Sequence, residues 1–149
     1  MKTGTLYLIP NLLGKEAPLE SSLPANIDQT MSLLDGLIAE SAMKGRAFLQ
    51  KFKLKRPPNQ IPIAQWGEDI DFLLEPLLEG ETWGFVSDCG LPCLADPGAL
   101  LVKRAHQKGI KVEALVGPSS IYLALMLSGL PGQQFFFHGY LAKEPSKRE

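Results

Sequence analysis

Residues 83–98 read WGFVSDCGLPCLADPG, in which an apolar run passes directly into a loop rich in glycine and proline. The run from Trp83 to Ser87 predicts a buried strand. The loop from Asp88 to Gly98 holds two glycines and two prolines in eleven residues. Because glycine lets the backbone approach a ligand closely and proline restricts the loop before a ligand binds, this segment is the first candidate for a binding site.

Apolar strands and amphipathic helices alternate on both sides of this segment. The apolar runs predict strands at 5–9, 37–39, 61–64, 83–87, 111–116 and 135–137. Helical spacing predicts helices at 27–34, 41–52, between Gly67 and Gly80, at 99–108 and at 119–127. Pro62 predicts that its strand is an edge strand or an irregular one, and Pro76 predicts a kink or an early end of its helix. The alternation is typical of an α/β fold with an open, mostly parallel sheet and helices on both faces.

Charge and hydropathy exclude several classes of protein. The 149-residue chain carries 15 Lys and Arg against 16 Asp and Glu, a formal net charge of −1. This balance argues against a polyanion-binding tail, so any contact with nucleic acid needs a local patch. The longest purely apolar stretch, Ile121 to Leu127, is far below the roughly 18 residues that cross a bilayer. Pro10 interrupts the N-terminal apolar run, so we expect no signal peptide, no membrane contact and a cytoplasmic protein.

The cysteines and histidines do not have the spacing of a metal site. Cys89 and Cys93 are separated by three residues, which is neither a CxxC motif nor a disulfide framework. His106 and His138 are far apart in the sequence and add no ligand cluster. We therefore expect no bound metal.

Three loops rich in glycine and proline follow predicted strands, at 10–14, 88–98 and 117–120. Open α/β sheets bind ligands at the carboxyl ends of their strands, where these loops begin. A single loop of this kind is best interpreted as a turn, whereas three at one edge favour a preformed pocket. The sequence has no GxGxxG after its first strand, no GxxxxGK[ST] and no GxSxG, which disfavours phosphate-cradling nucleotide chemistry and a nucleophile triad.

Segment 86–98, followed by Val116-Gly117-Pro118-Ser119-Ser120 and Ser128-Gly129-Leu130-Pro131, resembles the tetrapyrrole methylase superfamily of S-adenosylmethionine-dependent methyltransferases. The branch it resembles most methylates the ribose 2′-hydroxyl of a cytidine in small-subunit ribosomal RNA. The similarity extends to Leu6–Pro10 and Phe137–Leu141, so it covers nearly the whole chain.

The resemblance implies a domain organisation. Members of the family have two α/β domains with the cofactor in the cleft between them, and this chain resembles only the first. We expect a cofactor-cleft domain at 1–140, with 141–149 as a linker or the truncated start of a missing C-terminal domain. Half a cleft cannot bury the usual 70 to 90% or so of a ligand, so we expect weak cofactor binding by this chain alone. Its bare cleft-facing surface favours self-association, and we expect a homodimer.

The resemblance also implies which residues contact S-adenosylmethionine. Backbone from the long loop, side chains packed beside it and two serines of the next loop form the expected set: Pro10, Asp88, Cys89, Gly90, Leu91, Leu94, Ser119 and Ser120. Two segments depart from the RNA-modifying branch, Asn11–Glu16 and Glu40–Met43, and both face the substrate side in that branch. Cofactor use is therefore better supported than an RNA substrate.

A ribose hydroxyl acceptor needs a general base within hydrogen-bonding reach. Glu40 and Asp88 are the candidate catalytic residues, and Asp96 is a further candidate. The alternatives remain open: Asp88 and Asp96 could cap the loop or the helix that begins near Gly98, and Glu40 could satisfy a helix N-terminus.

The basic residues Lys51, Lys53, Lys55 and Arg56 are a candidate RNA contact, although such runs are usually solvated helix ends. Two other functions also remain open. One is a methyltransferase of a tetrapyrrole or another small molecule, and the other is a non-catalytic α/β module that binds a protein partner through this sheet edge.

Overall fold

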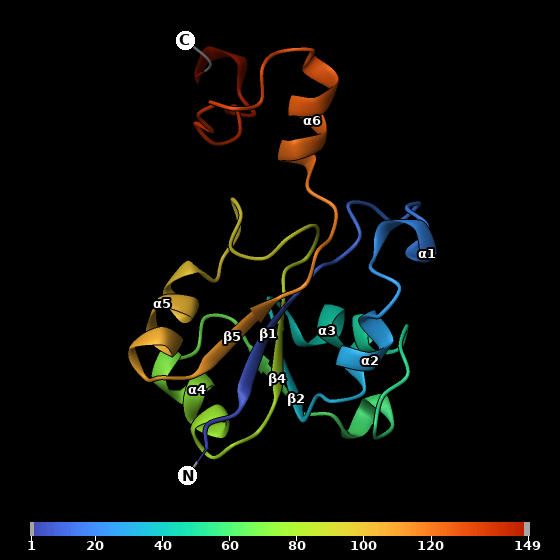
Figure 1. The fold of residues 1–149 in the computed structure, drawn as a ribbon, viewed down its shortest axis with the longest axis vertical. Coiled ribbons are helices and arrows are strands. Elements are labelled where there is room, and N and C mark those ends of the chain that lie inside the picture. Colours follow the sequence, from blue (N-terminus) through green and yellow to red (C-terminus); the bar gives the residue numbers. More distant parts are fainter. Residues whose placement is uncertain (1, 148–149) are drawn as a thin grey trace. The chain divides into compact units, whose positions relative to one another are not determined.

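The computed structural model describes residues 2–147, which divide into two compact units, the first ending at Ser119 and the second beginning at Ser120. The first unit contains a five-stranded sheet in the order β3-β2-β4-β1-β5, in which every neighbouring pair is parallel (Figure 1). The strands are β1 Thr5–Ile9, β2 Gly36–Ala39, β3 Ile63–Gln65, β4 Trp83–Val86 and β5 Lys111–Ala114. The predicted open parallel sheet is therefore confirmed.

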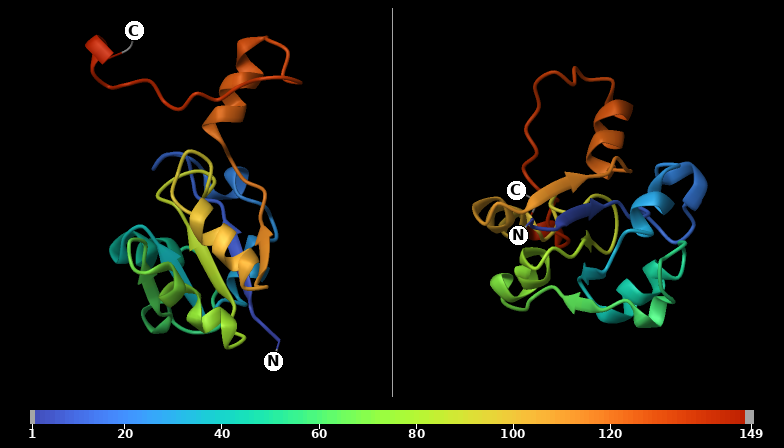
Figure 2. Two further views of the ribbon diagram at one scale, coloured as in Figure 1. Left: turned by 90° about the vertical axis from the view of Figure 1, so that its left-hand side faces the viewer. Right: turned by 60° about the horizontal axis from the view of Figure 1, so that its bottom comes forward.

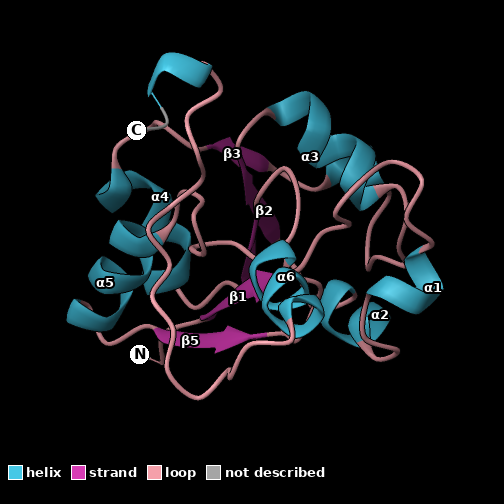
Figure 3. Ribbon diagram, turned by 90° about the horizontal axis from the view of Figure 1, so that it is seen from above, coloured by secondary structure: helices cyan, strands magenta, loops and turns pink. Residues whose placement is uncertain are grey.

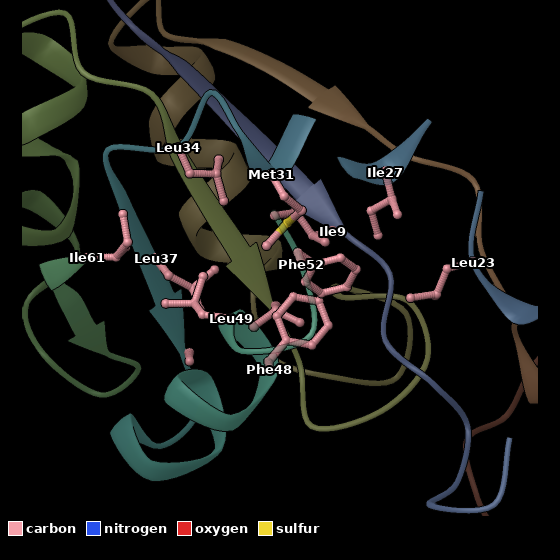
Figure 4. Close-up of a cluster of buried hydrophobic side chains, with 12 residues drawn as sticks. Ile9, Leu23, Ile27, Met31, Leu34, Leu37, Phe48, Leu49, Phe52 and Ile61 are labelled. Carbon is pink, nitrogen blue, oxygen red and sulfur yellow. The ribbon is translucent and has the colours of Figure 1, made fainter. Parts of the chain in front are cut away.

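Helices cover both faces of this sheet (Figure 3). They are α1 Leu19–Ser22, α2 Ile27–Met31, α3 Ala42–Leu49, α4 Ile70–Leu78 and α5 Ala99–Gln107, with a short 3-10 helix at Pro58–Gln60. Successive side chains of a strand point to opposite faces, so each strand contributes to two cores. Ile9 and Leu37 pack with residues of α2 and α3 (Figure 4), whereas Leu6 and Phe85 pack with residues of α4 and α5.

The two edge strands differ from the central ones. All residues of β2 and β4 are buried, as expected for strands covered on both faces, but Lys111 and Ala114 of β5 are exposed. Pro62 directly precedes β3, and its carbonyl accepts a hydrogen bond from the Leu37 N–H at 3.0 Å. The prediction of an edge strand next to Pro62 is confirmed.

Helix ends follow from local capping. The Ser41 hydroxyl accepts the N–H of Lys44, and the Asp69 carboxylate accepts the N–H groups of Asp71 and Phe72 at the start of α4. Of the kink or early end predicted at Pro76, the early end is wrong, because α4 runs on to Leu78. Leu77 is fully buried in the core and the Glu79 N–H donates to the Glu75 carbonyl, so the last turn holds although Pro76 lacks a donor.

The second unit contains α6, Ser120–Ser128, and a 3-10 helix at Pro145–Lys147. The predicted strand at 135–137 is wrong, because these residues pair with no strand within the described part of the chain. Three consecutive phenylalanines have strong β-propensity, but a strand also needs a partner. Instead the Phe137 and Tyr140 rings meet edge to face, and the Tyr140 hydroxyl lies 3.1 Å from the Ser120 hydroxyl.

None of the helices in residues 2–147 combines the length and the apolar character needed to cross a membrane.

Candidate functional site

The carboxyl edge of the sheet contains a point where the chain changes direction. From β1 the chain crosses over to β2, beyond β4, whereas from β4 it crosses in the opposite sense to β5. β1 and β4 are neighbours, with Ile9 paired to Val86, so the two connections leave adjacent strand ends in opposite directions, and each passes the other strand. Figure 2 shows these two loops, blue and yellow-green, at the same end of the sheet. Open α/β sheets bind ligands at such a switch point.

The three loops singled out in the sequence meet at this edge. A Cβ added to Gly117, in the loop after β5, would lie 2.1 Å from Cβ of Pro10 and 3.2 Å from Cδ2 of Leu91. Gly90 has a positive φ of 67°, and a Cβ there would lie 3.3 Å from Cδ2 of Leu13. A side chain at Gly117 would clash with Pro10, so glycine lets the loop after β5 approach the loops after β1 and β4 closely.

Asn11 joins the loops after β1 and β4, a role that the sequence analysis missed. Its Nδ2 donates to the carbonyls of Ser87 and Asp88, at 3.0 and 3.1 Å, and its backbone N–H donates to the Gly90 carbonyl at 2.8 Å. Its Oδ1 accepts the N–H of Leu12 at 2.8 Å. The sequence signal for this role was an asparagine directly after the proline that ends the strand, because asparagine side chains readily form hydrogen bonds with the backbone of loops.

Polar contacts with other segments of the chain hold two of the three candidate bases, Glu40 and Asp88. The Glu40 carboxylate accepts the backbone N–H of Asp88 at 2.8 Å, and the Asp88 carboxylate forms an ion pair with Lys44. Glu40 therefore ties the end of β2 to the end of β4. It does not cap α3, where Ser41 takes that position.

Asp96 is in a different environment from Asp88. Burial raises its pKa above the ordinary value, the negative charges of Glu40 and Asp88 raise it further, and the Ser87 hydroxyl opposes the shift. Asp96 does not cap α5, because the N-cap is Gly98 and no side chain bonds there. The negative charges of Glu40 and Asp88, near the ends of β2 and β4, thus act on the carboxyl group of Asp96.

The remaining residues expected at the cofactor differ in exposure. Pro10, Gly90 and Ser119 are buried, Leu91 and Leu94 are half-buried, and Asp88 and Cys89 are exposed in the first unit. Ser120 is exposed at the first residue of α6, in the second unit. Both cysteines are free, and burial raises the pKa of each thiol, so neither is activated as a thiolate.

A pocket of about 420 Å³ adjoins this edge and is called the lysine pocket here. Its lining comes from the loops after β1 and β4 and from α3 and the residues that follow it: Asn11, Leu12, Gly14, Lys15, Lys44, Ala47, Phe48, Lys51, Asp88 and Cys89. Another pocket, of about 410 Å³, lies between β3 and α4 and contains none of the expected site residues. Of these two pockets, the lysine pocket is the one that adjoins the switch point.

The four basic residues proposed for RNA do not form one patch. Lys55 forms an ion pair with Asp35, and an Arg56 Nη donates to the Asp35 carbonyl at 2.9 Å. Asp35 directly precedes β2, at the amino edge of the sheet, so Lys55 and Arg56 belong to the end opposite the switch point. Only Lys51 of the four lines the lysine pocket.

The residues described by the structure include no group of three or more His, Cys, Asp or Glu side chains placed to hold a metal ion.

Comparison with other proteins gives a consistent set of relatives, although no family model matches the chain. A protein of Xylella fastidiosa (strain Temecula1) named "Ribosomal RNA small subunit methyltransferase I" is 34% identical over 147 residues, which are 97% of this chain and 52% of that protein. Proteins of the same name from Thermotoga maritima and Escherichia coli O157:H7 are 32% and 30% identical, over 80% and 98% of this chain.

The chain spans about half the length of the curated relatives it matches, since the matched regions are 54% of the Thermotoga protein and 50% of the Escherichia coli protein. The matches to the Xylella and Escherichia coli proteins cover the strand-end loops, because they span 97% and 98% of this chain. The family resemblance inferred from segment 86–98 is confirmed: this chain is homologous to the N-terminal half of the ribosomal RNA small subunit methyltransferase I proteins of the tetrapyrrole methylase family.

Proposed function

We propose that this chain is the cofactor-edge half of an S-adenosylmethionine-dependent methyltransferase that acts on a ribose 2′-hydroxyl of ribosomal RNA. The observation that carries the proposal is the similarity, over 97% of the chain, to a protein named as a ribosomal RNA small subunit methyltransferase. The convergence of three loops at a switch point supports a ligand site at the matching place in this fold. The proposal includes a cytoplasmic location and a second α/β domain that completes the cleft.

The residues at the carboxyl edge fit a small polar cofactor. Gly90 and Gly117 let the loops after β1, β4 and β5 pack closely at this edge, because a Cβ at either position would meet a neighbouring loop. We assign the cofactor contacts to the set expected from the family: Pro10, Asp88, Cys89, Gly90, Leu91, Leu94, Ser119 and Ser120. When bound, S-adenosylmethionine supplies a methyl group on a sulfonium, which is a strong electrophile.

The protein's own contribution is positioning and proton transfer. Glu40 and Asn11 hold the backbone of the loop at Asp88, so the residues that face the cofactor keep their places before it binds. Methylation of a hydroxyl releases its proton, which needs an acceptor. Asp88 forms an ion pair with Lys44, whereas burial and nearby negative charge raise the pKa of Asp96, which makes its carboxylate a better proton acceptor than an ordinary aspartate. We therefore place Asp96 beside Glu40 and Asp88 among the candidate catalytic residues.

Self-association is the remaining part of the proposal. Within the second unit, α6 and the segment after it expose large apolar side chains, among them Tyr122, Met126, Leu127 and Phe136. Exposed apolar surface of this kind favours a protein contact, and we propose a homodimer.

Methyl transfer from tritiated S-adenosylmethionine tests the proposal. The assay compares small ribosomal subunits with small tetrapyrroles as acceptors, for this chain and for a fusion to the second half of the Xylella relative. We expect the fusion to label ribosomal RNA and the chain alone to label it weakly. Label in tetrapyrroles instead would identify a small-molecule enzyme. Failure of the fusion both to bind the donor and to transfer its methyl group would favour the non-catalytic module.

A further inference from the structure

The lysine pocket concentrates positive charge in a chain that is otherwise close to neutral. Three ammonium groups, those of Lys15, Lys44 and Lys51, share its lining with one carboxylate, that of Asp88. Lys44 is already paired with Asp88. Lys15 and Lys51 take part in none of the ion pairs formed within residues 2–147. Two cations in this pocket therefore have no ion-pair partner among residues 2–147.

The two lysines come from different elements and face one cavity. Lys15 lies in the loop after β1, and Lys51 lies two residues beyond the end of α3. Both are exposed, so a ligand much larger than the pocket can reach them. Asn11 cannot supply a further donor through its Nδ2, which already serves the carbonyls of Ser87 and Asp88. The charge available to a ligand is thus that of Lys15 and Lys51.

The pocket also adjoins the proposed cofactor edge. Its lining includes Asp88 and Cys89, which belong to the expected cofactor set, and Asn11, which fixes their backbone. A ligand held between Lys15 and Lys51 therefore lies beside the place where the acceptor must present its hydroxyl.

We propose that the lysine pocket binds backbone phosphates of the RNA acceptor strand through Lys15 and Lys51, and so holds the adjacent nucleotide at the cofactor edge. This inference rests on the proposed function. Ammonium groups bind phosphate as point charges, and a strand that neutralises them releases counterions. The pocket, which includes Lys51, thereby replaces the set Lys51, Lys53, Lys55 and Arg56 as the RNA contact.

Binding of a short fluorescein-labelled single-stranded oligoribonucleotide, measured by anisotropy over a series of salt concentrations, tests this proposal on the full chain. The pocket variant is Lys15→Gln/Lys51→Gln. The matched control is Lys53→Gln/Lys103→Gln, which removes the same charge from two exposed lysines outside the pocket. With a slope of about −0.7 per neutralised phosphate for single strands, the pocket variant should flatten the plot of log K against log salt by roughly 1.4. The control should keep the slope of the wild type.

Equal flattening in both variants, or an unchanged slope in the pocket variant, would overturn the proposal. Absence of salt-dependent RNA binding by the wild type would also overturn it. Calorimetry with S-adenosylmethionine distinguishes failure of this proposal from failure of the proposed function. The pocket variant should bind the donor with the same affinity as the wild type. A tenfold loss of donor affinity in the pocket variant would instead assign the lysines to the donor's carboxylate. If inorganic phosphate at the same concentration as the RNA fully suppressed RNA binding, the pocket would be a site for free phosphate and not for an RNA strand.

Discussion

Replacing Gly117 with alanine tests most simply whether the three strand-end loops are packed together. The added Cβ would lie 2.1 Å from Cβ and 2.9 Å from Cγ of Pro10. Carbon atoms normally approach to about 3.5 Å or more, so Pro10 or the loop after β5 must move by roughly 1.4 Å. Pro10 is buried and its ring is rigid, so the displacement cannot be absorbed by a side-chain rotation.

Overpacking of this kind costs about 1–3 kcal/mol. We expect Gly117→Ala to lower the free energy of unfolding by that amount, and the urea midpoint by roughly 1 M for an m-value of about 1–3 kcal/mol/M. Gly132→Ala is the control, because its Cβ would meet only Leu125 at ordinary contact distances of 3.6 and 3.9 Å. A Gly117→Ala protein as stable as the wild type would refute the packing of these loops.

Two further predictions concern the polar contacts of the same edge. Asn11→Ala should lower the free energy of unfolding by about 1–2 kcal/mol, because it removes bonds to the carbonyls of Ser87 and Asp88 and the acceptor of the Leu12 N–H. Asn11→Asp should lower the free energy of unfolding, measured with urea, by at least as much, because a carboxylate cannot donate hydrogen bonds to these carbonyls. Equal stability of Asn11→Asp and the wild type would contradict this prediction. Asp96→Asn should stabilise the protein at neutral pH but not at acidic pH. The folded state raises the pKa of Asp96, so the folded chain binds its proton more tightly, and the wild type loses stability as pH rises from about 4 through the raised pKa. Thermal unfolding of both proteins across this range should show a gap that widens with pH, and a constant gap would argue against the acidic cluster.

Much of the fold was predictable from local sequence patterns. The apolar runs around Ile9, Ile38 and Phe85 identified the central strands, because side chains buried on both faces leave no alternation with polar residues. Pro62 identified an edge strand for the same physical reason that it cannot occupy a central one. The strand at 135–137 was a wrong prediction because β-propensity is local whereas pairing depends on the rest of the fold.

The candidate site was predictable only in part. Glycine and proline spacing indicated which loops form the edge, and the contacts of Gly117 with Pro10 and Leu91 bring those loops together. The links between segments distant in sequence carried no comparable signal. Examples are the Glu40 carboxylate on the Asp88 N–H and the Asn11 side chain on the next loop. The separation of Lys51 from Lys55 and Arg56 likewise depends on where the chain turns after α3, which composition does not report.

Titration of the isotope-labelled chain with S-adenosylmethionine, followed through backbone amide chemical shifts, tests the central claim most directly, because it detects the weak binding expected of half a cleft. The account predicts progressive shifts at Gly90, Leu91 and Ser119, with none at β3. Shifts confined to the pocket between β3 and α4, or none at the three loops at saturating donor, would contradict a cofactor site at the carboxyl edge.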